Sequence, residues 1–377
     1  MVNETTLSLY FICHHSRTDE VIKDGEFIKR VAFEKRMPVT FFFSGVELEA
    51  ILRERETIKW ALDGFDLVAA IQGDFFINPR FGMAYPYRPE LGIMTFNHVP
   101  LAQPFLEDQG EYLKGVLPDQ IGRSINIAQY GFHKTPVTIH ASDGVYAPYS
   151  AHDVRQQGVD TVVASGEFLD GNERAKGNLY LASGLRHLIR NNSLQIQARE
   201  FYNAGHFVDV ARYKASLTNG GRVVSGCDSN EVNGMSESAN GMSLRDGIAR
   251  VCCIGDEAYR SGVRLINCNA SAHLPNRNGD HADLESIWPW NDVHAMQNAE
   301  GNLSWIMGDR NDIISYAVWL VGERHRQRWD VREAKEHLYL AADSALRHEH
   351  YGHFLTGHFK YHINQAIGLL QGDKYYN

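Results

Sequence analysis

Short apolar segments that end in a polar residue recur through the first half of the chain. Apolar, β-prone runs occupy residues 7–13, 39–43, 65–71, 91–96, 137–139 and 161–164, and helical patterns cover 24–36 and 47–62. The polar residues that follow the runs are His14, Ser44, Asp74, His98 and Asp143. This alternation predicts an α/β fold with a parallel sheet, most simply a distorted (β/α)7-type barrel whose mouth collects these residues. A doubly wound open sheet is the alternative.

The later part of the chain divides into two regions. Short strands are expected at 222–224 and 263–268, with a loop rich in Gly, Ser and Asn at 225–245. From about residue 285 helical patterns dominate, at 313–324, 331–347 and 359–370. The sequence therefore predicts a barrel domain over 1–284, which carries the catalytic site, and a C-terminal helical domain over 285–377.

Charge and composition narrow the class of partner and the compartment. The net charge of −9 disfavours nucleic acid or an anionic membrane as the main partner. The N-terminal segment resembles neither a signal peptide nor a spanning helix, and the five cysteines lack metal-binding or disulfide spacing. We expect a cytoplasmic protein with reduced thiols. A monomer and a homo-oligomer both stay open.

Candidate chemistry lies at the strand ends and near the C-terminus. Asp228 and Glu231 follow the strand at 222–224, as Asp143 follows the strand at 137–139. His358 and His362 are spaced i, i+4, as in some metal sites on helices. No HExxH motif is present, so we expect these histidines to make structural or substrate contacts. No nucleotide-binding glycine motif follows any strand, so we expect no cofactor. Because the C-terminal histidines lack a carboxylate partner, we also expect no catalytic metal.

Several motifs, in order, resemble those of glycoside hydrolase family 57. His14 after the first strand resembles the first motif of that family, and MTFNHVPLAQPF resembles its strand ending in a histidine element. Asp143-Gly-Val-Tyr-Ala-Pro resembles the nucleophile motif, and CDSNEVNG resembles the second acid motif. GNLSWIMGDRNDIISYAVWL and LAADSALRHEHYGHFLTG resemble motifs of the helical region.

The resemblance implies a carbohydrate-active enzyme, a retaining glycoside hydrolase or glucanotransferase that acts on α-linked oligo- or polysaccharides with two carboxyl groups. It implies Asp143 as nucleophile and Asp228 or Glu231 as acid/base. The residues that it implies as sugar contacts are His14, His98, His140, Trp288, Trp305 and Asp343. The tryptophans are equally compatible with core packing.

The chain departs from the family pattern at the nucleophile and at the second acid. Asp replaces Glu at position 143, which shortens the side chain by roughly 1.5 Å, and Asp228 matches its motif only with a shift in spacing. Two other functions therefore stay open. One is a metal-dependent polysaccharide deacetylase-like hydrolase, for which His14, Asp74, His98, His140 and Asp143 offer ligands. The other is a carbohydrate-binding relative that has lost its nucleophile.

Overall fold

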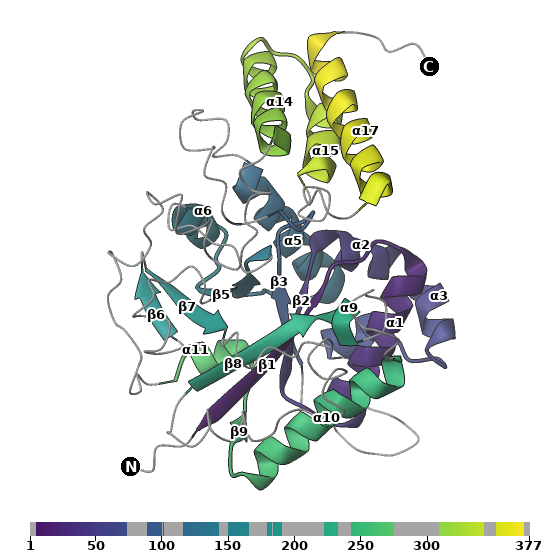
Figure 1. Cartoon of the computed structure of the whole chain (residues 1–377), viewed down its shortest axis with the longest axis vertical. Coiled ribbons are helices and arrows are strands. Elements are labelled where there is room, and N and C mark those ends of the chain that lie inside the picture. The colour runs from purple at the N-terminus through teal and green to yellow at the C-terminus, as the bar shows by residue number, and fades with distance from the viewer. Residues whose placement is uncertain are drawn as a thin grey trace.

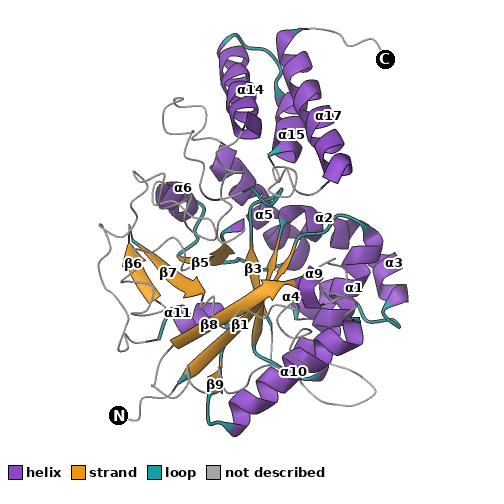
Figure 2. Ribbon diagram, in the orientation of Figure 1, coloured by secondary structure: helices purple, strands orange, loops and turns teal. Residues whose placement is uncertain are grey.

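The structure is a computed structural model of the whole chain (Figures 1 and 2). It describes residues 5–73, 89–99, 101, 116–142, 150–165, 179–182, 184–190, 222–232, 243–274, 309–342 and 352–372. All structural statements below concern these residues.

Seven parallel strands form a nearly closed barrel, in the order β7-β5-β4-β3-β2-β1-β8. The strands at the two ends of this path, β7 and β8, lie close together, and this contact brings the sheet round on itself. A further strand, β6, is antiparallel to β7, and β9 is parallel to β1. The bounds are β1 Thr6–Cys13, β2 Val39–Phe43, β3 Glu90–Ile93, β4 Thr138–His140, β5 Thr161–Ser165, β6 Leu179–Ala182, β7 Leu185–Arg190, β8 Arg222–Asp228 and β9 Arg264–Leu265. The predicted (β/α)7-type barrel is confirmed.

The two faces of β1 show how the sequence divides the core. Leu7, Leu9, Phe11 and Cys13 pack outward against helices, whereas Tyr10 and Ile12 point into the barrel. Both faces are buried, which explains why β1 is mostly apolar and why its polar residues, Thr6 and Ser8, are buried as well. The same two-residue period directs His14, just beyond the strand, to the inner side.

Helices cover the outside of the barrel (Figure 1). In chain order they are α1 Thr18–Ile28, the π-helix η1 Lys29–Glu34, α2 Gly45–Arg53, α3 Arg55–Ala61, α4 Leu67–Gln72, α5 Val116–Phe132, α6 Ala151–Gln156, α9 Ser229–Val232 and α10 Leu244–Arg260. A further helix, α11 Cys268–Ala272, contributes Cys268 and Ala272 to the cluster inside the barrel. The start of α2 is capped by Ser44, whose hydroxyl accepts a hydrogen bond from the Glu47 backbone N–H. The sharp end of β2 thus leads directly into a helix.

Three C-terminal helices pack together beyond one side of the barrel: α14 Asp309–Arg326, α15 Arg332–Ala341 and α17 Gly352–Gln371 (Figure 2). They share a hydrophobic cluster with β3, β4, α5 and β5. Two ion pairs join α15 to α5, Lys335 with Asp119 at 2.6 Å and Arg123 with Glu336 at 2.7 Å. The expected helical region is present, and the predicted boundary between residues 284 and 285 lies outside the described residues.

Some predicted elements differ from the observed ones. The run at 65–71 is not a strand: residues 67–72 form α4, because Asp66 caps the N-terminus and Gly73, at φ 89°, ends the helix in the left-handed region. The helix expected at 47–62 is divided at Glu54 into α2 and α3. The strand expected at 263–268 is reduced to β9 and followed by α11, which Asn267 caps.

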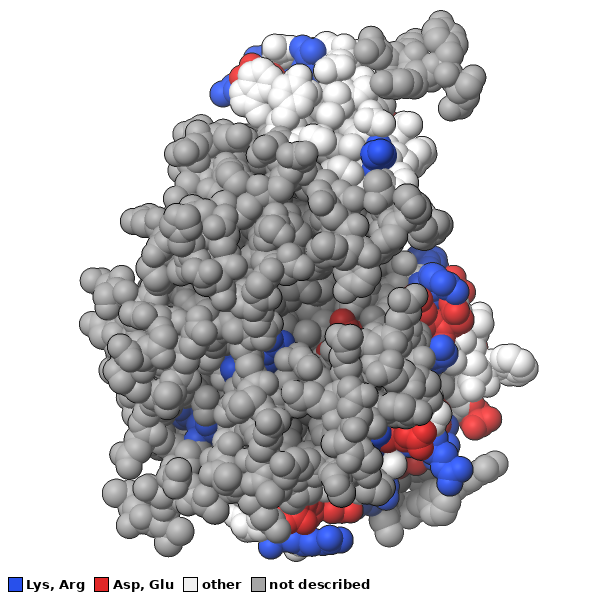
Figure 3. Space-filling view, in the orientation of Figure 1, with Lys and Arg blue, Asp and Glu red and all other residues white. Residues whose placement is uncertain are grey.

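Charged side chains of both signs intermix on the face shown in Figure 3, over α1, α3 and α10. Arg30 pairs with Glu26 and Glu34 along one helical face, and Arg55 pairs with Asp66 at 2.6 Å. Such alternation is typical of a solvated surface. None of the described helices combines the length and the apolar character needed to cross a bilayer.

Gly247 determines how closely α10 approaches α9. A Cβ atom built on Gly247 would lie 1.5 Å from the carbonyl oxygen of Val232, a backbone atom that cannot rotate away. We expect Gly247→Ala to lower the free energy of unfolding by about 2–3 kcal/mol, measured by urea titration. The matched control is Gly357→Ala in α17, where a Cβ meets nothing within 4 Å; it should raise stability by about 0.5–1 kcal/mol. Equal effects at the two positions would contradict the close approach.

Candidate active site

His14 and Asp228 meet at the carboxyl ends of two neighbouring strands. His14 follows β1 and Asp228 is the last residue of β8, whose register pairs Ile12 with Asp228. The Nε2 atom of His14 lies 2.7 Å from Oδ2 of Asp228, and the two side chains are 18% and 29% exposed. One proton lies between them, held either by the imidazole or by the carboxyl group. The pair can therefore accept or release a proton at a solvent-accessible position, as acid–base catalysis requires.

His98 lies over the same pair, on a tight turn after β3. The His98 N–H donates to the Thr95 carbonyl, and the Thr95 hydroxyl donates to the Val99 carbonyl at 2.7 Å. Gln120 of α5 fixes the turn, because its side-chain oxygen accepts from the Asn97 N–H at 2.8 Å. His98 has φ 55°, in the left-handed region, which this bonded turn makes tolerable. The turn delivers the His98 ring to the mouth of the barrel.

The His14 and His98 rings are stacked, with centroids 4.5 Å apart and planes within 6° of parallel. A metal ion bound by an imidazole lies close to the plane of the ring, where the nitrogen lone pair points. Two parallel planes at this spacing share no such position near both rings. The arrangement favours hydrogen bonding by these histidines over joint ligation of one metal ion.

His140, at the end of β4, lies deeper in the barrel. Its ring packs against Tyr10 at 5.0 Å and Phe42 at 5.4 Å between centroids, and the residue is 1% exposed. Neither ring nitrogen has a hydrogen-bond partner within the described part of the chain. Burial, assisted by the charges of Arg190 and His98, holds the pKa of His140 well below its ordinary value. The imidazole is therefore neutral, and its role as a sugar contact stays a prediction.

The burial of His140 predicts a specific dependence of stability on pH. Below pH 6.5 the unfolded chain binds a proton at this residue while the folded chain does not, so the free energy of unfolding falls as the pH falls. His140→Phe keeps an aromatic ring in the cluster and should remove up to about 1.4 kcal/mol per pH unit from that slope. Urea unfolding at several values between about pH 5 and pH 7 measures it. His152→Phe, at an exposed position on α6, is the control and should leave the slope unchanged. Parallel slopes for wild type and His140→Phe would contradict the assignment.

The other predicted site residues are described only in part or not at all. Glu231 belongs to α9, the short helix that begins directly after Asp228, and its side chain is not described. Four predicted site residues lie outside the described residues: Asp143, Trp288, Trp305 and Asp343. Ser142, the last described residue before Asp143, is fully buried two positions beyond the end of β4. Asp74, one of the polar residues expected at the mouth, also lies outside the described residues.

Sequence reasoning missed two groups of polar residues near the site. Arg190 ends β7 and lies near the Tyr10 hydroxyl inside the barrel. Its positive charge partly opposes the effect of burial, which raises the pKa of Tyr10.

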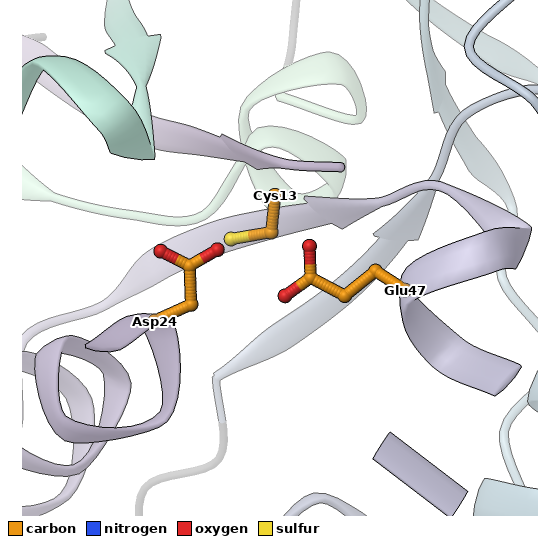
Figure 4. A group of neighbouring side chains, drawn as sticks. All are labelled: Cys13, Asp24 and Glu47. Atoms are coloured by element: carbon orange, nitrogen blue, oxygen red, sulfur yellow. The ribbon is translucent and has the colours of Figure 1, made fainter. Parts of the chain in front are cut away.

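The second group lies on the outer side of β1, where Cys13, Asp24 and Glu47 are buried together (Figure 4). The signal for this second group is the position of Glu47, one turn before Ala50 and Ile51 on the buried face of α2, where an apolar residue is expected.

Comparison with known proteins identifies the fold. No family model matches the sequence, and no curated protein matches it. Among solved structures, the 4-alpha-glucanotransferase from Thermococcus litoralis superposes with a TM-score of 0.64 at 12% identity, over 97% of this chain and 60% of that one. The GH57-type branching enzyme from Pyrococcus horikoshii matches with a TM-score of 0.59 at 13% identity, over 98% and 89% of the two chains.

A third similar structure is the alpha-amylase AmyC from Thermotoga maritima, with a TM-score of 0.59 at 10% identity, over 98% of this chain and 94% of that one. This chain spans only 60% of the glucanotransferase, the first of the three. The family 57 resemblance predicted from the sequence is thus confirmed at the level of the fold, which extends over nearly the whole chain.

Proposed function

We propose that this chain is a carbohydrate-active enzyme that cleaves or transfers α-linked glycans with two carboxyl groups, Asp143 and Asp228. The observation that carries the proposal is the hydrogen bond between His14 and Asp228 at the mouth of a barrel with this fold. The names of the similar structures support the substrate class, since they include a 4-alpha-glucanotransferase, a branching enzyme and an alpha-amylase.

In the proposed reaction Asp143 attacks the anomeric carbon while Asp228 donates a proton to the departing glycosidic oxygen. The bond from Asp143 to the sugar forms as the glycosidic bond breaks. Water, or a sugar hydroxyl in the transfer reaction, then attacks the covalent intermediate, and the Asp228 carboxylate takes its proton. Asp228 thus ends each cycle protonated, as it began.

His14 supports this reaction by holding the Asp228 carboxyl group in one orientation. Its contact at 2.7 Å with Oδ2 fixes one of the two carboxyl oxygens. The His98 ring, stacked parallel on the His14 ring, limits rotation of the His14 side chain. This support matters because Asp is shorter than Glu, and misplacement of a reacting group by about 1 Å costs on the order of 10²-fold in rate.

The experiment is incubation of the purified chain with maltooligosaccharides, followed by chromatography of the products. Shorter and longer oligosaccharides together indicate transfer, whereas shorter ones alone indicate hydrolysis. Asp63→Asn is the matched control for Asp→Asn variants at the two proposed carboxyl groups, since Asp63 is 94% exposed in a loop on the outside of the barrel. Binding of the oligosaccharides without any product would support the carbohydrate-binding alternative and overturn the proposal.

A further inference from the structure

Cys13, Asp24 and Glu47 form a buried cluster on the outer side of β1, separate from the mouth of the barrel. Cys13 ends β1, Asp24 comes from the buried face of α1 and Glu47 from the first turn of α2. One ligand-type atom of each lies within 4.8 Å of those of the other two, and Figure 4 shows the three side chains pointing toward one another. All three residues are fully buried.

Hydrogen bonds satisfy only part of this cluster. The Ser229 hydroxyl donates to Oδ2 of Asp24 at 3.1 Å, and the His15 N–H donates to Oε2 of Glu47 at 2.7 Å. The second carboxyl oxygen of Glu47, Oε1, is buried and no N–H or O–H of the described residues donates to it, although the Glu47 and Asp24 carboxyl groups are close enough to share a proton. A buried acceptor left in this state is costly unless a proton or a cation reaches it.

His15 adds an independent observation. It is 7% exposed, and its Nε2 atom has no hydrogen-bond partner among the described residues while lying 3.5 Å from Oδ2 of Asp24. Two ligands of a tetrahedral zinc ion, each about 2 Å from it, lie about 3.3 Å apart. An unpartnered imidazole nitrogen thus lies at ligand spacing from Asp24, one member of the cluster.

We propose that Cys13, Asp24 and Glu47, with His15 as the fourth ligand, bind one divalent transition-metal ion of the zinc class. The combination of one thiolate, one imidazole and carboxylates suits zinc, whereas calcium and magnesium prefer oxygen ligands alone. Binding removes a proton from the Cys13 thiol, which passes to solvent as the Cys13 sulfur bonds the ion. The ion cross-links β1, α1 and α2.

The metal site would stabilise the positions of His14 and Asp228 from the outer side of β1. Cys13 directly precedes His14, and Ser229, which contacts Asp24, directly follows Asp228. The ion itself faces the outer helical layer, so it does not touch the substrate. Its role is to fix the ends of β1 and β8, and the proposal stands whether or not the chain acts on glycans.

Metal analysis of the purified full chain, after a chelator wash that removes ions held by surface histidines, tests the site. Wild type should retain about one zinc-class ion per chain, and Cys13→Ala about a tenth of that or less. Cys268→Ala is the matched control, because Cys268 is an equally buried thiol inside the barrel, and it should retain the full amount. Protein produced with cobalt should show a thiolate-to-cobalt charge-transfer band that Cys13→Ala lacks and Cys268→Ala keeps.

Glu47→Gln distinguishes a bound metal ion from a proton shared within the cluster. It also provides a second test of the site if Cys13→Ala fails to fold. Gln keeps the oxygen that accepts from the His15 N–H. If the metal site exists, the Glu47→Gln variant should lose its metal to the chelator at least about tenfold faster than wild type. Wild-type protein free of metal and without the cobalt band would overturn the proposal. It would leave a protonated Glu47 carboxyl as the group that satisfies the cluster, in which case Glu47→Gln should be as stable as wild type.

Discussion

Asp143→Asn is expected to abolish turnover of maltooligosaccharides while the protein stays folded. The exchange keeps the size of the side chain and removes the charge that attacks the anomeric carbon in the proposed reaction. Because the covalent route itself is lost, the rate should fall by more than the roughly 10²–10⁴-fold that a single acid–base group contributes. Initial rates of product formation measure the loss, and circular dichroism with thermal unfolding shows that the fold is retained.

The matched comparison is Asp63→Asn, the same chemical change at an exposed loop position, which should leave the rate within about twofold of wild type. If Asp143 only caps a turn or the following helix, Asp143→Asn should cost little as well, since Asn caps about as well as Asp. Near-native turnover by Asp143→Asn would therefore eliminate Asp143 as nucleophile. Glu231, paired with Asp228, would then be the next carboxyl group to test.

Asp228→Asn is expected to slow turnover of maltooligosaccharides by about 10²–10⁴-fold. Asn can keep the hydrogen bond to Nε2 of His14 through its amide group, so the geometry of the pair is preserved while the proton donor is lost. The characteristic result concerns the leaving group. An aryl glycoside with an acidic phenol departs without protonation, so its rate of bond cleavage should fall much less than that of a maltooligosaccharide.

His14→Phe provides the comparison for Asp228→Asn. It keeps a planar ring but removes the hydrogen-bond partner of the carboxyl group, so both substrates should slow by similar factors. An equal loss on both substrates in Asp228→Asn would show that Asp228 positions other groups and is not the proton donor. The two variants together thus distinguish the general acid from the residue that holds it.

The strands were predictable where burial on both faces left a run of mostly apolar residues. Residues 7–13 and 39–43 are such runs, and β1 and β2 coincide with them closely. The run at 65–71 has the same composition, and its helical structure depends on local capping by Asp66 and Gly73. Short apolar runs do not distinguish a strand from a buried helix by periodicity, and length alone did not resolve this one.

The candidate site was predictable at the level of strand ends. His14, His98 and Asp228 each follow or end a strand, and parallel strands bring such residues to one mouth. The specific partner of each residue was not predictable, because the contact between His14 and Asp228 requires β8 to pair with β1 across more than half of the chain. The cluster behind β1 was missed because its members are scattered over separate elements, and only the helix packing makes them neighbours.

Arg123 of α5 gives the C-terminal helices a connection to the mouth of the barrel. Its guanidinium group pairs with Glu336 of α15 and also lies 3.6 Å above the ring of Phe96, whose N–H donates to the Gln120 carbonyl in the turn that carries His98. Arg123 therefore connects α15, through one side chain, to the turn that carries His98. We expect removal of these helices to loosen the mouth of the barrel, so a shortened chain designed to keep the site should end after α17, not before α14.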